Sequence, residues 1–151
     1  NKPAVAWSSH PKGDVPEGHY RVPIGSAHVV RPGSHVTIVT YGTMVHVCAA
    51  AAAQLGVDAE VIDIRSIVPL DAETIWTSVR KTGRCVVAHE ATRCSGFGAE
   101  ILATIQEECF WHLESPIQRV AGWDTPYPHA FEWEYFPGQA RVAAAITAAL
   151  E

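Results

Sequence analysis

The chain has 151 residues, of which 48% are hydrophobic and 18% are charged, with a formal net charge of −5. This length suits one domain with a real hydrophobic core. The net negative charge, without a basic stripe, argues against nucleic acid as a partner. No apolar run is long enough to cross a bilayer, so the sequence also argues against a membrane partner.

The four cysteines are Cys48, Cys85, Cys94 and Cys109, and no two of them have CxxC spacing. Three lie within apolar patterns, which predicts reduced, buried thiols in a cytosolic protein. The cysteines and the eight histidines lack the paired short spacings of a structural zinc site, so we expect no metal-binding residue. The chain begins with Asn rather than Met, so it can be a fragment of a longer protein.

Residues 1–34 contain many prolines and glycines, a composition typical of a linker rather than a domain. Tyr20, Val22 and Ile24 are nevertheless apolar, as is Trp7, so we expect this segment to lie against a surface. Residues 27–30 are predicted to form a short edge strand.

The regular part begins with a β-branched run at residues 36–40, which predicts a strand covered on both faces. Thr43 is predicted to cap a helix through residues 44–55, and Gly56 to end it in the left-handed conformation. Residues 59–64 form the second predicted strand.

The remaining elements alternate in the same way. A helix from its N-cap Asp71 to Gly83 is followed by a strand at 85–88 and by a helix whose apolar stripe falls within residues 101–113. A strand at 117–121 and a closing helix from Gly138 complete the chain. This alternation predicts an α/β fold of three layers, with a mostly parallel sheet and helices on both faces.

His89 and Glu90 follow the predicted strand at 85–88, where open α/β sheets usually place ligands. His89 with Cys94 is a possible thiol–imidazole pair, in which the base activates the nucleophile. That chemistry needs a group to orient the imidazole and an oxyanion hole, and the sequence identifies neither. A loop histidine beside an incidental cysteine is therefore the favoured interpretation, and a small stand-alone Cys/His enzyme is the alternative from another class.

Gly96-Phe97-Gly98 precedes a helix and has the look of a phosphate-binding turn. The third glycine is missing, and Glu100 places a negative charge where an anion would sit. We favour two glycines that allow a sharp turn and close packing.

Aromatic side chains are concentrated between residues 122 and 137, in a predicted loop rich in proline. A monomer rarely leaves that much apolar surface in water. Cover by the chain itself and cover by a partner are equally good interpretations.

The order of motifs resembles a known family. The motifs are residues 40–45, residues 61–71, His89-Glu90-Ala91, Gly96–Glu100, Arg119-Val120 and Asp124–Pro128. They resemble the C-terminal domain of the transketolase-like thiamine enzymes, and within these the β subunit of the decarboxylating component of 2-oxo acid dehydrogenase complexes. Residues 123–129 and 135–137 look more like the branched-chain than the pyruvate type. The resemblance covers residues 21–151.

This resemblance implies an enzyme that oxidatively decarboxylates 2-oxoisovalerate-type acids and transfers the acyl group to lipoyl groups. Thiamine diphosphate and magnesium belong to the full enzyme, between the α subunit and the N-terminal half of the β subunit. Residues 1–34 are then the linker from a missing pyrimidine-binding half, and residues 35–151 the transketolase C-terminal-like domain. No residue here matches a catalytic or cofactor-binding position, so the chain alone is expected to bind no cofactor and to be inactive.

The implied partners are the α subunit and a second β subunit in a heterotetramer, and the subunit-binding domain of the lipoyl acyltransferase core. Asp124 and the carboxylate at Glu151 would meet a basic partner, with Trp123 and Tyr127 excluding water. Alternatively, Asp124 caps its own turn. The implied location is the cytoplasm, or the mitochondrial matrix in a eukaryote. The β subunit of a pyruvate or acetoin dehydrogenase is the alternative within the family.

Overall fold

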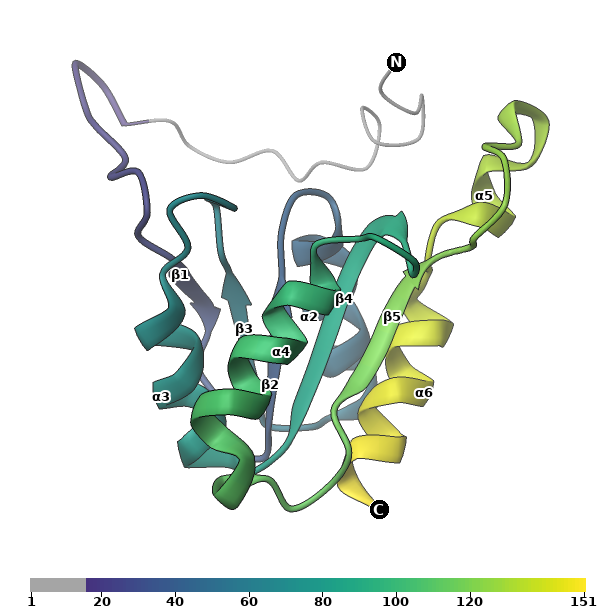
Figure 1. The fold of residues 1–151 in the computed structure, drawn as a ribbon. Coiled ribbons are helices and arrows are strands. Elements are labelled where there is room, and N and C mark those ends of the chain that lie inside the picture. The colour runs from purple at the N-terminus through teal and green to yellow at the C-terminus, as the bar shows by residue number, and fades with distance from the viewer. Residues whose placement is uncertain (1–15) are drawn as a thin grey trace.

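The computed structural model describes residues 16–151, which form one five-stranded sheet covered by helices on both faces (Figure 1). The strand order is β1-β3-β2-β4-β5, with β1 antiparallel to β3 and the other neighbours parallel. The predicted α/β class with a mostly parallel sheet is confirmed. The strands are β1 (His28–Arg31), β2 (Val36–Thr40), β3 (Ala59–Asp63), β4 (Cys85–Thr92) and β5 (Gln118–Gly122). The helices are α2 (Met44–Leu55), α3 (Ala72–Thr82), α4 (Gly98–Cys109), α5 (Glu132–Tyr135) and α6 (Gln139–Leu150), with 3₁₀ turns η1 (Phe110–His112) and η2 (His129–Phe131).

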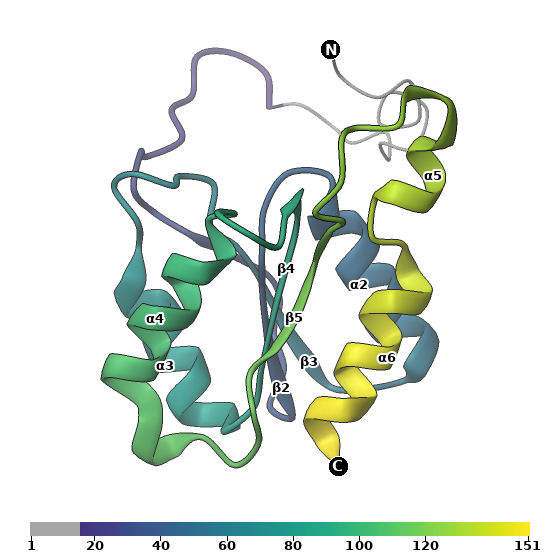
Figure 2. The ribbon, with the colours of Figure 1, turned by 45° about the vertical axis from the view of Figure 1, so that its right-hand side comes forward.

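Helices α2 and α6 cover one face of the sheet, and α3 and α4 cover the other (Figure 2). All five residues of β2 are buried, because this strand lies at the centre of the sheet and between both helix layers. Its β-branched composition suits such a position. Side chains alternate across a strand, so Ile38 packs in the α2–α6 core and Val39 in the α3–α4 core.

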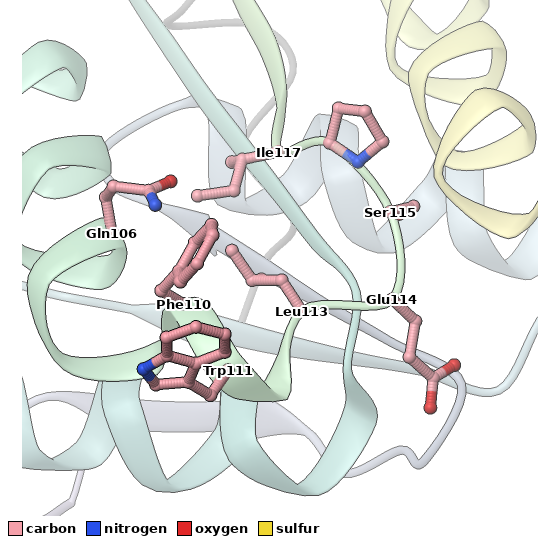
Figure 3. A pocket seen from close by; sticks show the side chains of 8 residues that line it. Gln106, Phe110, Trp111, Leu113, Glu114, Ser115 and Ile117 are labelled. Carbon is pink, nitrogen blue, oxygen red and sulfur yellow. The ribbon is translucent and has the colours of Figure 1, made fainter.

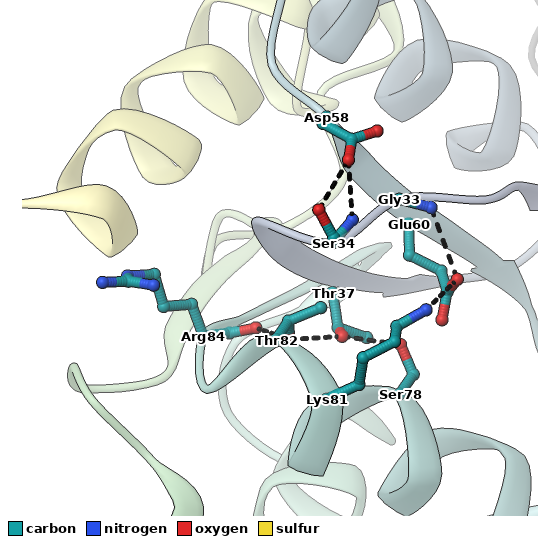
Figure 4. Close-up of polar contacts among 9 residues, drawn as sticks. All are labelled: Gly33, Ser34, Thr37, Asp58, Glu60, Ser78, Lys81, Thr82 and Arg84. Carbon is teal, nitrogen blue, oxygen red and sulfur yellow. Dashed lines mark hydrogen bonds and ion pairs between the residues drawn. The ribbon is translucent and has the colours of Figure 1, made fainter.

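A buried hydroxyl cluster ties β2 to α3 (Figure 4). The Thr37 hydroxyl lies 2.6 Å from the Ser78 Oγ and 2.8 Å from the Thr82 Oγ1. Beside it, the Lys81 Nζ donates to the Glu60 Oε2 at 2.5 Å. These bonds satisfy polar groups that the sheet and helix would otherwise bury without partners.

Three of the four predicted helix-end residues are confirmed, and the fourth is not. Gly56 and Gly83 adopt left-handed conformations with φ of 65° and 67°, and the Asp71 Oδ1 accepts a hydrogen bond from the Thr74 backbone N–H. The predicted Thr43 cap is wrong, because no side-chain cap bond forms there. Thr43 is itself helical, with φ −61° and ψ −32°, whereas a capping residue needs extended backbone.

Strand β4 is longer than its apolar run, so the prediction that it ends at Ala88 is wrong. The strand continues through His89 and Glu90 to Thr92, with an irregular register between Ala88 and Thr92. Gly122 on β5 makes this possible, since a Cβ there would lie 2.4 Å from the Glu90 carbonyl oxygen. A glycine opposite the irregularity lets the two backbones approach closely.

The segment before β1 leaves Tyr20, Val22 and Ile24 between 52% and 82% exposed, so this chain does not itself supply the surface that the segment is expected to lie against. That expectation stays a prediction. The part of that expectation that concerns Trp7 falls outside the described residues. Within residues 16–151, no helix is long and apolar enough to cross a membrane.

Candidate docking edge

The parallel strands β2, β3, β4 and β5 end along one edge of the sheet, which we call the carboxyl edge. Two segments meet there: the corner formed by residues 89–98, and the aromatic segment formed by residues 122–136. Open α/β sheets usually bind ligands or partners at this edge. In Figure 1, the aromatic segment with α5 stands above the end of β5.

His89 is completely buried at the corner, 0% exposed. Its Nδ1 lies 3.0 Å from the Ala91 carbonyl oxygen, and its ring stacks on Tyr41 with centroids 6.1 Å apart. Burial lowers the pKa of His89, so the imidazole is neutral. Because a carbonyl only accepts, Nδ1 carries the proton, and the Nε2 has no hydrogen-bond partner among the described residues.

The two glycines of the corner are explained by this imidazole. A Cβ on Gly98 would lie 2.2 Å from the His89 Nε2, and a Cβ on Gly96 would lie 2.1 Å from the Thr92 carbonyl oxygen. Neither distance allows a side chain, so the interpretation of close packing is confirmed. Close packing therefore accounts for the glycines of this turn without a bound phosphate.

Cys94 does not pair with His89. Its side chain is exposed, with the Sγ 3.9 Å from the Ser95 Oγ, and no hydrogen bond between Cys94 and His89 exists in the described part of the chain. The structure therefore does not assemble a nucleophile and a base from these two residues. Glu90 shows no contact with Cys94 either, and burial raises the pKa of its carboxyl group.

Asp124 connects the two segments of the carboxyl edge. Its Oδ1 accepts a hydrogen bond of 2.7 Å from the Cys94 backbone N–H, across 30 residues of sequence. The alternative was that Asp124 caps its own turn, but its carboxylate instead caps a backbone N–H of the neighbouring corner. The side chain remains exposed, and one carboxylate oxygen of Asp124 has no recorded partner within residues 16–151.

Trp123 lies next to Asp124 and is 53% exposed. Its indole Nε1 donates to the Glu134 carbonyl oxygen at 2.9 Å, which ties β5 to α5. The Arg141 guanidinium lies 4.3 Å from the centroid of the indole ring. A cavity of about 420 Å³ opens here, lined by Arg93, Ala121, Gly122, Trp123, Asp124, Thr125 and Arg141.

The aromatic segment divides into an inner and an outer part. Tyr127 packs edge-on against Tyr135, with centroids 5.3 Å apart, and Tyr135 is only 8% exposed. Phe131 and Trp133, in contrast, are 59% and 67% exposed. The chain thus covers its inner rings itself and leaves its outer rings exposed. Cover by the chain holds for the inner part, and cover of the outer part by a partner stays a prediction.

Glu151 lies away from the other predicted partner-binding residues. Helix α6 begins beside the carboxyl edge, and the C-terminus lies at the opposite edge of the sheet (Figures 1 and 2). A helix of this length spans about 18 Å. The structure places Trp123, Asp124 and Tyr127 on one loop and does not bring Glu151 to them.

Sequence reasoning missed a second surface, at the opposite edge. A groove of about 470 Å³ is lined by residues from Gln106 to Ile117, among them Phe110, Leu113 and Pro116 (Figure 3). Trp111 is 90% exposed beside it. The available signal was that Phe110 and Trp111 fall out of phase with the buried stripe of Ile101, Ile105 and Cys109.

No group of three or more His, Cys, Asp or Glu side chains that could hold a metal occurs in residues 16–151. The model of the family described as "Transketolase, C-terminal domain" matches residues 25–142. Among solved structures, a chain titled "Split gene transketolase, inactive beta4 tetramer" superposes with a TM-score of 0.78 at 31% identity. That likeness covers 93% of the present chain and 45% of the other.

The curated relatives below share the name of a dehydrogenase β subunit. A "2-oxoisovalerate dehydrogenase subunit beta" of Pseudomonas aeruginosa is 61% identical over 151 residues, which is 100% of this chain and 43% of the relative. The Dictyostelium discoideum protein "2-oxoisovalerate dehydrogenase subunit beta, mitochondrial" is 49% identical over 82% of this chain and 35% of its own length. A "3-methyl-2-oxobutanoate dehydrogenase subunit beta" of Mycobacterium tuberculosis is 46% identical, over 88% and 40%. The chain thus spans less than half the length of these relatives.

Proposed function

Because the chain belongs to the transketolase C-terminal domain family, we propose that it is the C-terminal domain of a branched-chain 2-oxo acid dehydrogenase β subunit. The observation that carries this proposal is the 61% identity to a 2-oxoisovalerate dehydrogenase β subunit along the whole chain. The enzyme would oxidatively decarboxylate 2-oxoisovalerate-type acids in the cytoplasm, or in the mitochondrial matrix of a eukaryote. Residues 1–34 would lead from a pyrimidine-binding half, and residues 35–151 would serve assembly and docking.

The chemistry of thiamine diphosphate and magnesium would take place elsewhere in the enzyme. One observation supports this division: the glycine turn before α4 packs directly against the buried His89 ring, so its glycines are accounted for without a diphosphate. Calorimetric titration of the 151-residue chain with thiamine diphosphate and magnesium should give no heat of binding. Micromolar affinity would overturn the proposed division of roles.

The domain would contact an α subunit and a second β subunit in a heterotetramer, and the subunit-binding domain of a lipoyl acyltransferase. Trp123, Asp124 and Tyr127 support docking at the carboxyl edge, because an exposed carboxylate beside aromatic rings suits an incoming cation. Glu151 lies at the other edge of the sheet, so its carboxylate would meet a different part of the assembly.

Asp124 offers a sharp test, because Asn and Ala should behave differently. Asp124→Asn keeps an oxygen that accepts from the Cys94 N–H, so the melting temperature should hardly move. It removes the charge, and we expect docking to the subunit-binding domain to weaken by about 2 kcal/mol. Asp124→Ala loses the charge and the hydrogen bond, and should lower both affinity and melting temperature.

Surface plasmon resonance on the reconstituted heterotetramer and its variants measures the affinity. If Asp124→Asn docks as tightly as the wild type, Asp124 has a structural role only. The same material separates the branched-chain enzyme from a pyruvate or acetoin dehydrogenase, since turnover on 2-oxoisovalerate should exceed turnover on pyruvate or acetoin. The reverse preference would favour one of these alternatives.

A further inference from the structure

Three arginines gather at the carboxyl edge without carboxylate partners. Arg65, Arg80 and Arg84 each form an ion pair elsewhere in the domain. Arg93, Arg119 and Arg141 form none with any of residues 16–151. All three instead donate to backbone carbonyls, two of them in β5 and one at Arg93, directly after β4.

These carbonyl bonds hold the guanidinium groups in place. The Arg141 Nη2 donates to the Ala121 carbonyl at 2.6 Å, while its Nη1 is buried without a partner among the described residues. Arg119 donates to the Arg93 carbonyl, and its Nε is likewise buried without a partner there. Both unpaired nitrogens are out of contact with solvent, so a partner would meet the charges that line the cavity rather than these two atoms.

Arg93 and Arg141 line the cavity of about 420 Å³ beside Trp123. The one acidic side chain among its lining residues is Asp124, and the Cys94 N–H already bonds one oxygen of that carboxylate. Glu90 and Glu132 belong to the same edge but do not line the cavity, and Glu132 accepts from the Tyr127 hydroxyl. The walls therefore carry one more positive than negative charge.

We propose that this cavity receives a carboxylate side chain of an acidic partner segment, between Arg93 and Arg141 and against Trp123. Guanidinium groups bind carboxylates through paired, charge-assisted hydrogen bonds. Arg and Trp are also the residue types on which protein interfaces most depend. The inference rests on the proposed docking role and specifies its chemistry. The docked segment would carry an acidic side chain in this cavity, beside any basic side chain that meets Asp124.

The test uses the ¹⁵N-labelled 151-residue chain and three probes: a hexaglutamate peptide, a hexalysine peptide and inorganic phosphate. The readout is the indole N–H resonance of Trp123, assigned with Trp123→Phe. We expect hexaglutamate to shift this resonance in a saturable way and Arg93→Gln to weaken its binding at least tenfold. Arg80→Gln removes an ion-paired arginine of α3 and should change nothing.

Arg93 is the preferred site of substitution because it is exposed and its one recorded donated bond is long, at 3.4 Å, so its loss should not unfold the domain. Equal binding by wild type and Arg93→Gln would overturn the proposal, as would a shift caused by hexalysine alone. Phosphate that binds as tightly as the peptide would overturn it too, since the cavity would then be a site for free anions.

The proposal and the docking function can fail separately. If the reconstituted heterotetramer does not bind the subunit-binding domain at all, the docking function fails. If it binds, and the Arg93→Gln heterotetramer binds equally well, only the role of the arginines fails.

Discussion

The corner of residues 89–98 and the aromatic segment of residues 122–136 lie side by side. Both contain residue types that often occur in functional sites, but the corner buries its histidine and the aromatic segment exposes a tryptophan. In the corner, His89 is buried against Gly98 and bonded to Ala91, so a residue of catalytic type serves packing. In the aromatic segment, Trp133 belongs to the same helix as the buried Tyr135 and stays exposed. Residue type alone suggests a function in both regions, and the degree of burial distinguishes the packing role of His89 from the exposed surface of Trp133.

The largest effect in the corner is expected from Gly98→Ala. The new Cβ would lie 2.2 Å from the His89 Nε2, and this imidazole is completely buried, bonded to Ala91 and stacked on Tyr41. We expect the free energy of unfolding to fall by about 3 kcal/mol, measured by urea denaturation. Gly138→Ala is the matched control, because nothing lies within 4 Å of its Cβ position and its φ of −92° suits alanine. Equal stabilities of the two variants would mean that the corner is loosely packed.

A smaller effect is expected from the titration of His89. Its pKa in the folded state lies below the ordinary value of about 6.5, chiefly because burial disfavours the charged form. Below about pH 6.5, His89 therefore binds a proton in the unfolded chain, whereas in the folded chain it does so only at a lower pH. Stability should fall as the pH falls, with a slope from this group of at most about 1.4 kcal/mol per pH unit. The slope from this group fades as the pH rises through about 6.5, because the imidazole of the unfolded chain then loses its proton as well.

The raised pKa of Glu90 acts in the opposite direction, so the test compares slopes between variants. His89→Asn keeps a side-chain donor for the Ala91 carbonyl and removes the titration. Urea denaturation between pH 5 and 7 should show a shallower loss of stability in this variant. Gly138→Ala, which removes no titrating group and whose Cβ position is open, should retain the wild-type slope. Identical slopes in all three proteins would show that His89 titrates in the same way in the folded and unfolded chain.

The sequence predicted those features that depend on neighbouring residues. The β-branched run of β2, the N-cap Asp71 and the left-handed Gly56 are local signals, and all three are present. The length of β4 was missed because it depends on Gly122, which lies opposite the bulge on another strand. The bond from Cys94 to Asp124 joins residues 30 apart, and no local pattern encodes it.

A still smaller effect is expected from Cys94→Ser. The thiol is exposed and is not bonded to His89, so the side chain takes part in no nucleophile–base pair of the described chain. Turnover of the reconstituted heterotetramer should change by less than tenfold, about the smallest effect that we would assign to a catalytic group. A loss of several orders of magnitude would restore the Cys/His enzyme as an interpretation.

The smallest effect on stability is expected from Trp133→Ala, and it completes the comparison within one helix. Trp133 is 67% exposed and touches the ring of Phe131, which is itself 59% exposed, so its removal should change the free energy of unfolding by less than about 0.5 kcal/mol. Tyr135→Ala, two residues along α5, removes a ring that packs on Tyr127 and Phe136, and should cost about 3 kcal/mol. Urea denaturation of both variants measures this contrast. If Trp133→Ala were as destabilising as Tyr135→Ala, the outer rings would belong to the core of the domain. If it is silent in stability but weakens docking of the heterotetramer, water-exposed Trp133 is kept for a partner, because an exposed tryptophan contributes little to the fold on its own.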